Sequence, residues 1–283
     1  MKKNILITGA TGGIGKATAL QLAQKNCRIT ILGRNEIKLS ALRTKIISET
    51  NNKDIFTLRC DLSSLDSIKK AAIKFKEDNT YLDVLINNAG VSPGVRQETV
   101  DGFEMNFGVN HLAPFLLTNL LLPLLEKGRN PRIVIVASAA YTMSNRDIDD
   151  LNWRNRPYKM MTTYSTSKLF NIYFMLELAE RLKDKNITVN ALHPGIVKSQ
   201  LFSTATGIMG VLNKAIEMFY TTPEKGARTS VYLATSDKVK NVTGKYFANS
   251  KEKKITSKYL DAKFQNELWN KSNKFVGITG NIE

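Results

Sequence analysis

The segment that decides the fold is Thr8-Gly9-Ala10-Thr11-Gly12-Gly13-Ile14-Gly15. It joins the apolar, β-branched run of residues 4–8 to the helical pattern of residues 14–25. A strand that turns tightly into a helix aims free backbone N–H groups and the positive end of the helix dipole at one point, and glycines there let a pyrophosphate approach closely. In this context the pattern Gly-x-x-x-Gly-x-Gly predicts a dinucleotide-binding loop rather than a tight turn alone. The candidate cofactor contacts are Gly9, Thr11, Gly13, Ile14 and Gly15.

Outside this segment, short apolar runs alternate with longer stretches of helical period. Such alternation predicts βαβ units and a parallel sheet. The predicted strands are residues 4–8, 28–32, 55–60, 84–87, 132–137, 188–193 and 245–248. The predicted helices are residues 14–25, 36–49, 65–78, 104–125, 164–183 and 223–235. We therefore expect an α/β fold, a single-domain, Rossmann-type doubly wound parallel sheet with helices on both faces.

The whole chain is expected to form one domain. Its 283 residues, 42% hydrophobic and 23% charged, exclude a disordered, collagenous or disulfide-scaffold protein. Because no linker or repeat divides the chain, we assign residues 1–250 to the Rossmann domain. The Lys-rich residues 251–283 are interpreted as a basic, peripheral C-terminal extension of that domain. Residues 141–163 and 196–222 interrupt the alternation, and long segments of this kind are usually functional or locally structured.

The net charge is +16, from 41 basic and 25 acidic residues. A charge of this size favours an anionic partner, which can be nucleic acid, anionic lipid or a cofactor. The lysines are scattered and do not interleave with aromatic residues in an RNA-binding pattern. We therefore expect a solvated surface and no nucleic-acid partner, and a peripheral membrane contact stays open.

The cysteines and the apolar runs indicate a cytoplasmic protein. Cys27 and Cys60 each lie in an apolar run, which is typical of reduced core cysteines. The first apolar run, Ile5–Ile7, is shorter than the roughly 7 residues of a signal peptide's apolar region. Prolines interrupt residues 112–125, which fall short of the roughly 20 residues that span a bilayer, so no transmembrane span is expected.

The end of the second predicted strand indicates which dinucleotide is bound. An acidic residue there would accept a hydrogen bond from the 2′-hydroxyl of NAD. The sequence has Gly33 and Arg34 instead, and a guanidinium suits a 2′-phosphate. We expect NADP(H), with NAD less favoured, and the alternative is a plain surface arginine. Asp61, at the end of the third strand, is expected to cap the next helix, to hydrogen-bond the adenine, or to do both.

Tyr164 and Lys168 place a phenol and an ammonium on one face of a predicted helix. A tyrosine needs a shift of about 3 units from its usual pKa near 10 to act as an acid or base near neutrality, and a neighbouring cation helps to supply it. The same spacing recurs at Tyr259 and Lys263, beyond the last predicted strand, where we expect a surface pair.

Two polar segments at strand ends support the first pair. Ser138 follows the strand of residues 132–137, and Asn87-Asn88-Ala89-Gly90 closes the strand of residues 84–87. Both are carboxyl ends of strands, where open α/β sheets bind ligands.

Together these motifs resemble those of the short-chain dehydrogenase/reductase family. The matching pieces occur in family order over residues 4–248 and are Thr8-Gly9-x-x-x-Gly13-Ile14-Gly15, Asp61-Leu62, Asn87-Asn88-Ala89-Gly90, Asn110 in Val-Asn-His, Ser138, Tyr164-x-x-x-Lys168 and Pro194-Gly195. The long separation of Ser138 and Tyr164 is similar to the retinol-dehydrogenase-like branch. The segments Asp149–Trp153 and Gly244–Phe247 carry the same resemblance.

The resemblance implies hydride transfer between a nicotinamide and the carbon of a carbonyl or alcohol. It implies that Tyr164 protonates the carbonyl oxygen and Ser138 polarises it, while Lys168 lowers the pKa of the tyrosine and holds the nicotinamide ribose. Asn110 would support a water-mediated proton path. The implied cofactor contacts are Gly9, Ile14, Arg34, Asp61, Leu62, Asn88, Ala89, Gly90, Tyr164 and Lys168, with Pro194 and Gly195 at the nicotinamide end. No metal is implied.

The substrate and the partners are less specified. Residues 196–222 are rich in Met, aromatic and aliphatic side chains, which is typical of a lid over a lipophilic substrate, of a helix packed on the body, or of a subunit contact. We expect a small-molecule substrate, an apolar carbonyl compound or alcohol. The oligomeric state stays open: the resemblance is to proteins that often associate through the two long helices near Asn110 and Tyr164, which would give a homodimer or a homotetramer. The alternative function is a catalytically idle NADP-binding regulatory protein on the same fold.

Overall fold

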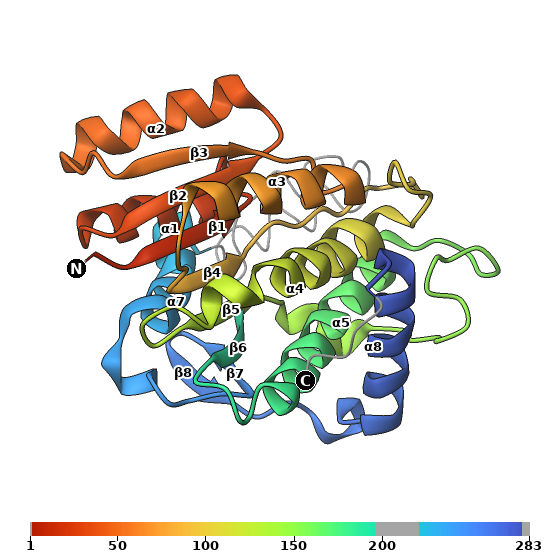
Figure 1. Ribbon diagram of the computed structural model, residues 1–283. Helices are drawn as coiled ribbons and strands as arrows, with labels where there is room; N and C mark the ends of the chain where they lie inside the picture. The colour runs from red at the N-terminus through yellow and green to blue at the C-terminus, as the bar shows by residue number, and fades with distance from the viewer. Residues whose placement is uncertain (1, 196–220, 279–283) are drawn as a thin grey trace.

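The computed structural model describes residues 2–195 and 221–278 (Figure 1). An eight-stranded sheet has the order β3-β2-β1-β4-β5-β6-β7-β8. The strands are β1 (Asn4–Thr8), β2 (Arg28–Gly33), β3 (Ile55–Arg59), β4 (Val84–Asn87), β5 (Arg132–Val136), β6 (Thr188–His193), β7 (Lys245–Ala248) and β8 (Lys251–Lys253). β1 to β7 are parallel, and only β8 is antiparallel to its neighbour. The predicted parallel sheet is thereby confirmed.

Helices cover both faces of this sheet (Figure 1). The α-helices are α1 (Gly13–Gln24), α2 (Glu36–Thr50), α3 (Leu65–Asp78), α4 (Ala113–Leu125), α5 (Met160–Arg181), α7 (Pro223–Thr235) and α8 (Ala262–Val276). Leu22, Leu39 and Leu233 belong to the core on the face of α1, α2 and α7. Phe75, Phe115 and other side chains of α3, α4, α5 and α8 form the core on the opposite face. The doubly wound architecture predicted from the sequence is confirmed.

The strand order reverses beside β1, whose neighbours are β2 on one side and β4 on the other. In open α/β sheets this switch point leaves a crevice outside the carboxyl ends of the strands, where ligands bind. The loops after Thr8 and after Asn87 lie there, so the fold brings the two predicted cofactor-binding segments together.

Side-chain caps start most of these helices. Asn35 caps α2, Ser64 caps α3, and Thr222 caps α7 ahead of a proline in the first turn. Each accepts a hydrogen bond from a backbone N–H that would otherwise lack a partner. α1 differs, because its N-cap residue Gly12 supplies no side-chain bond.

The helix expected at residues 104–125 begins differently from the prediction. Phe107–Leu112 form the π-helix η1, which leads into α4. Single π-turns are frequent at functional sites, and this one carries Asn110. Among the described helices, only Phe107–Leu125 is long and apolar enough to cross a membrane. However, 83% of its most apolar stretch is buried inside the protein, as is usual for a core helix.

The interpretation of residues 251–283 as a peripheral extension is wrong for most of the described part. β8 extends the sheet, and α8 buries Phe264, Leu268 and Trp269 in the main core. The expectation of a surface pair is right for Lys263, which is exposed, and wrong for Tyr259, which is 6% exposed and donates a hydrogen bond to the backbone oxygen of Thr142. The apolar residues of α8 recur at helical spacing, and the surrounding lysines obscured that pattern.

Candidate active site

The glycine loop is shaped by close backbone contacts. Gly9 has φ +66°, and a Cβ on it would lie 2.7 Å from Cα of Ala89. A Cβ on Gly15 would lie 2.3 Å from the carbonyl oxygen of Gly9, so α1 packs directly on the loop. Gly13 has φ +49° and faces open space. Larger residues would therefore strain or block this turn.

The start of α1 fits a pyrophosphate. Gly12 provides no side-chain cap, and the first turn of α1 contains no acidic residue. Its backbone N–H groups and dipole therefore face the open space beside Gly13, where an anion would be stabilised. The residues present fit the dinucleotide that the loop sequence predicts.

Asn88 and Ala89 hold this loop onto β4. Nδ2 of Asn88 donates to the backbone oxygens of Thr8, at 2.8 Å, and Gly9, at 3.2 Å. Oγ1 of Thr8 accepts from the backbone N–H groups of Asn88 and Ala89, both at 3.0 Å. Thr8 belongs to the glycine motif, but its supporting role is not predicted from the sequence, although a hydroxyl at the end of a buried strand is a usable signal.

At the ribose end, Gly33 lies beside the glycine loop. A Cβ on Gly33 would lie 3.4 Å from Cγ2 of Thr11, and Arg34 follows as an exposed side chain. Oδ1 of Asp61 accepts from the backbone N–H of Ser63, at 2.9 Å, and from its hydroxyl, at 2.8 Å. Because the α3 cap is Ser64, the expectation that Asp61 caps this helix is wrong.

Lys168 lies on α5 beneath the end of β5. Its side chain is buried, and Nζ donates to the backbone oxygen of Val136 at 3.2 Å. Burial lowers the pKa of Lys168 to about 8. Nζ lies 3.2 Å from the point where a Cβ on Gly90 would stand, so it faces the loop after β4. An ammonium has three donors, and two of these have no partner among the described residues.

Tyr164 and Ser138 meet at this edge of the sheet. The Ser138 hydroxyl hydrogen-bonds the Tyr164 phenol, and Nζ of Lys168 lies 5.5 Å from the centre of the tyrosine ring. Burial raises the pKa of Tyr164 to about 12, and the bond to Ser138 only partly offsets this. The lowered pKa implied for Tyr164 is therefore not seen in the protein alone.

Asn110 is fully buried on η1 and holds the segment after β4. Its Oδ1 accepts from the backbone N–H of Val91 at 2.8 Å, and its Nδ2 donates to the Val91 oxygen at 3.0 Å. Nδ2 also donates to Oγ of Ser167 at 2.9 Å. Oδ1 lies 3.4 Å from the position of a Cβ on Gly90, the same position that Nζ of Lys168 approaches. Asn110 and Lys168 thus flank one point of the backbone.

The end of β6 contributes a residue that the sequence did not single out. Nδ1 of His193 accepts a hydrogen bond from the backbone N–H of Ala139 at 3.2 Å, directly after Ser138. Burial lowers the pKa of His193, which favours the neutral ring. Pro194 and Gly195 follow, and Gly195 has φ +91° with Thr221 beside it. The lid predicted at 196–222 lies outside the described residues, apart from 221 and 222.

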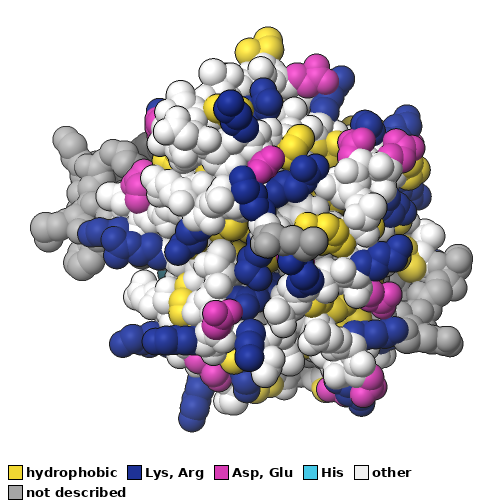
Figure 2. All heavy atoms as spheres, turned by 60° about the vertical axis from the view of Figure 1, so that its left-hand side comes forward, with side chains coloured by type: hydrophobic (Ala, Val, Ile, Leu, Met, Phe, Trp, Pro, Cys, Tyr) yellow, Lys and Arg dark blue, Asp and Glu magenta, His cyan; other side chains and the backbone are white. Residues whose placement is uncertain are grey.

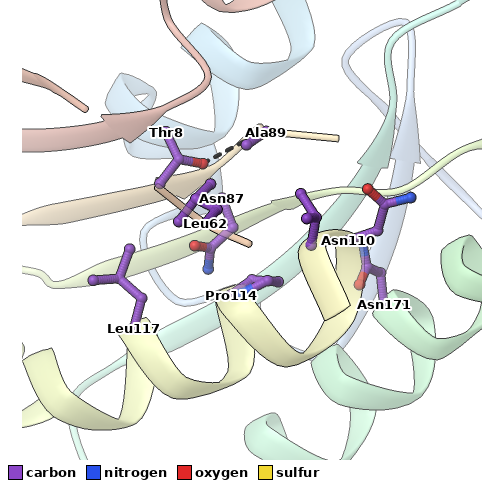
Figure 3. Close-up of a pocket in the computed structure, with 9 residues that line it drawn as sticks. Thr8, Leu62, Asn87, Ala89, Asn110, Pro114, Leu117 and Asn171 are labelled. Atoms are coloured by element: carbon purple, nitrogen blue, oxygen red, sulfur yellow. Dashed lines mark hydrogen bonds between the residues drawn. The ribbon is translucent and has the colours of Figure 1, made fainter. Parts of the chain in front are cut away.

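A small pocket separates the carboxyl ends of β1 and β4 from the beginning of α4 (Figure 3). Its lining residues are Thr8, Leu62, Asn87, Ala89, Val109, Asn110, Pro114, Leu117 and Asn171. Three predicted site residues from separate segments, Leu62, Ala89 and Asn110, therefore line the same pocket.

The charged side chains are scattered over the surface, as the sequence leads us to expect. Figure 2 shows one face of the molecule, on which Lys and Arg side chains are dispersed among acidic and uncharged ones. Some exposed lysines pair with a carboxylate one helical turn away, as Lys70 does with Asp66.

Comparison with known proteins identifies the family. The family model of short chain dehydrogenases matches residues 3–207. Human retinol dehydrogenase 13 is 40% identical over 282 residues, which cover 98% of this chain and 85% of that protein. Human polyprenol dehydrogenase is 36% identical over 280 residues, which cover 96% of this chain and 84% of that protein.

The solved structure of an uncharacterized protein from Mycobacterium paratuberculosis has a TM-score of 0.78 and 29% identity. The match covers 97% of this chain and 93% of that one. The chain therefore belongs to the short-chain dehydrogenase family, in its retinol-dehydrogenase-like branch, and is a nicotinamide-dependent oxidoreductase of alcohol and carbonyl groups.

Proposed function

We propose that this protein is an NADP(H)-dependent oxidoreductase that reduces a lipophilic aldehyde or ketone, or oxidises the corresponding alcohol. The observation that carries the proposal is the hydrogen-bonded pair of Ser138 and Tyr164 beside the buried Lys168. Ser138 follows β5 at the carboxyl edge of the sheet, and Nζ of Lys168 faces Gly90 in the loop after β4.

The bound cofactor would supply or accept the hydride. The side chains of this protein manage the oxygen and its proton. Ser138 and Tyr164 present two hydroxyls that hold the substrate oxygen, and Tyr164 transfers its proton to that oxygen during reduction. A phenol with a pKa of about 12 carries its proton at neutral pH, so the site is prepared to act as the acid. The protonated phenol is the state that the reduction step uses.

Lys168 has two tasks in this proposal. Its N–H donors that have no partner among the described residues suit the nicotinamide ribose hydroxyls. Its charge, close to the Tyr164 ring, stabilises the phenolate that remains after proton transfer. Asn110 fixes the backbone at Val91 and so the loop that borders the ribose site. The glycine loop would hold the pyrophosphate at the start of α1.

The preference for NADP(H) is supported by the two residues that end β2. Gly33 places no carboxylate near the ribose, and the exposed Arg34 supplies a cation that can approach a 2′-phosphate. Asp61, whose Oδ1 is held by Ser63, is proposed to hydrogen-bond the adenine.

The lipophilic substrate is supported by relatives. The proteins that are 40% and 36% identical to this chain are named for retinol and polyprenol, two apolar alcohols. Apolar residues are dense in the segment 196–222, which we propose as the substrate lid.

The test is cofactor oxidation with a panel of carbonyl compounds that runs from small polar aldehydes to retinaldehyde and long-chain ketones. We expect turnover with NADPH, fastest for the apolar compounds. Faster turnover with NADH, or with the polar compounds, would contradict the corresponding part of the proposal. Tight NADPH binding without turnover on any compound would favour the idle regulatory protein.

A further inference from the structure

Glu104 is a fully buried carboxylate just before the π-helix that carries Asn110. Its Oε1 accepts from the backbone N–H of Asn106, at 2.9 Å, and its Oε2 accepts from that of Phe107, at 2.8 Å. The carboxylate therefore holds the first N–H groups of η1, where a negative charge is favourable. A buried carboxylate keeps such partners because their loss would leave it desolvated without compensation.

The same carboxylate sets the orientation of the Asn106 amide. Nδ2 of Asn106 donates to Oε1 of Glu104 at 2.8 Å and to the Tyr158 hydroxyl at 3.2 Å. Because an ionised carboxylate can only accept, the amide must turn its NH2 group toward Glu104 and its oxygen away. That oxygen, Oδ1 of Asn106, is a third and longer acceptor for Nδ2 of Asn110, at 3.4 Å, and shares its hydrogens with the Val91 oxygen and Oγ of Ser167.

This chain of bonds continues into the site. Oδ1 of Asn110 accepts from the backbone N–H of Val91, in the loop that also contains Gly90. Glu104, Asn106 and Asn110 are all 0% exposed, so water does not compete for the hydrogen bonds between them. The orientation of Asn110 is thus coupled to a carboxylate that touches neither the pocket nor the reacting groups.

We propose that Glu104 is a positioning residue that acts through Asn106 to fix the Asn110 amide and, with it, the Val91 backbone of the active site. The part that concerns turnover depends on the proposed function. Glu104→Gln replaces one accepting oxygen by a donor, which faces N–H groups that also donate. The side chain at position 104 then no longer forces the Asn106 amide to point its NH2 group toward it and its oxygen toward Asn110.

The test uses the full chain and two readouts. The first is hydrogen exchange at the Val91 amide, which does not depend on catalysis. We expect Glu104→Gln to accelerate it at least about tenfold through the weaker bond to Asn110. Asn106→Ala should also accelerate exchange at the Val91 amide, and it keeps the hydrogen bonds of Glu104 to backbone N–H groups. It therefore replaces Glu104→Gln in the experiment if that variant does not fold.

Asp83→Asn is the matched control. Asp83 is also 0% exposed and accepts from two backbone N–H groups, those of Asn4 at 2.8 Å and Arg129 at 2.7 Å. It precedes β4, at the end of that strand opposite the site. Asp83→Asn should lower the melting temperature as Glu104→Gln does, but leave Val91 exchange and kcat unchanged.

The second readout is kcat with saturating cofactor. Glu104→Gln should lower kcat about tenfold in the wild-type background and cause no further loss when combined with Asn110→Ala, because both act on the same group. Val91 exchange that is the same in Glu104→Gln and Asp83→Asn would overturn the inference, as would additive losses in the double variant. If the wild type turns over no carbonyl, the proposed function fails, and the exchange experiment still decides the positioning role.

Discussion

At the residue scale, the pKa of Tyr164 is the balance of two opposing influences. Burial disfavours the phenolate and raises the pKa to about 12, whereas the hydrogen bond from Ser138 lowers it. The spacing of Tyr164 and Lys168 predicts a nearby cation, and the cation is there, 5.5 Å from the ring centre. Desolvation still prevails, which a sequence pattern does not reveal because it contains no information on burial.

Tyr164→Phe removes the proposed proton donor and leaves the ring in place. We expect kcat for carbonyl reduction to fall at least about a hundredfold, which is the lower end of what general acids contribute. The Kd for NADPH should stay nearly unchanged. Tyr232→Phe, a half-buried tyrosine on α7, is the control and should be silent. Tyr259 is unsuitable because it is buried and hydrogen-bonded. Activity within tenfold of wild type in Tyr164→Phe would refute the assignment.

The choice of cofactor is also decided by single residues. Arg34→Ala should weaken NADPH binding about tenfold and leave NADH binding nearly unaffected. A charge-assisted hydrogen bond contributes about 1.5–3 kcal/mol, and because Arg34 is exposed we expect the lower end of this range. Gly33→Asp should reverse the preference, because a carboxylate repels the phosphate and accepts from the ribose hydroxyl. A Cβ there is accommodated 3.4 Å from Thr11 and Leu39.

Fluorescence titration of both cofactors measures these Kd values. Arg28→Ala, at the opposite end of β2, removes the same charge and should change neither. Tighter binding of NADH than of NADPH by the wild type would show that Arg34 is only a surface charge.

At the scale of elements, α8 is fixed to η1 by a buried histidine. Nε2 of His111 lies 2.9 Å from Oγ of Ser272, and Phe107 stacks on the imidazole ring. Burial lowers the pKa of His111 to about 3. The unfolded chain protonates this histidine near its usual pKa of about 6.5, so protons bind the unfolded state first. Stability should therefore decrease as the pH falls from about 6.5 toward 3.

This dependence can be isolated by comparing His111→Leu with the wild type in urea unfolding between pH 6 and pH 4. The variant starts less stable, because the hydrogen bond between His111 and Ser272 and the stacking of Phe107 on the imidazole are lost. As the pH falls, the free energy of unfolding should decrease less steeply for the variant than for the wild type. The two slopes should differ by about 1.4 kcal/mol per pH unit, which corresponds to one proton. The other histidine, His193, is present in both proteins and cancels in the difference. Equal slopes would show that His111 does not resist protonation in the folded state.

The sequence predicts the strands of this sheet closely because buried parallel strands are nearly continuous apolar runs that end in glycine or polar residues. β1, β4, β6 and β7 have the bounds that the sequence indicates. η1 was not predictable, since the helical period does not distinguish a π-turn from an α-turn and does not show that Glu104 accepts from the N–H groups where η1 begins. α8 was missed although Phe264, Leu268 and Trp269 have helical spacing.

The site divides in the same way. The sequence motifs predict Ser138, Tyr164, Lys168 and Asn110, because the proposed reaction calls for these residue types at the ends of strands and on one helix face. Thr8 and the other supporting residues were missed, since their role lies in hydrogen bonds between segments far apart in the chain. Such contacts exist only after the strand order has placed the carboxyl ends of β1 and β4 side by side.

At the scale of the whole molecule, the sequence resemblance implies association through the helices near Asn110 and Tyr164. In this structure α8 lies against those helices (Figure 1). The ring centres of Trp269 and Phe115 are 4.8 Å apart, and Leu268 is buried beside them. Among the described residues, the large exposed hydrophobic side chains all lie outside α4 and α5. A stable homodimer usually requires an extended apolar surface, and these two helices do not offer one.

We therefore expect the full chain to be a monomer. The net charge of +16 acts in the same direction, because two copies that approach each other repel. Salt screens this repulsion, over a distance of about 10 Å at 0.1 M. If charge repulsion alone kept the copies apart, they would associate at high salt; if α8 covers the apolar faces of α4 and α5, the protein should stay monomeric. Sedimentation equilibrium at 0.05 M and 0.5 M salt measures both effects. The mass of one chain at both concentrations is the expected result. A dimer or tetramer at both would contradict the prediction, and one that forms only at high salt would show that charge, rather than α8, keeps the copies apart.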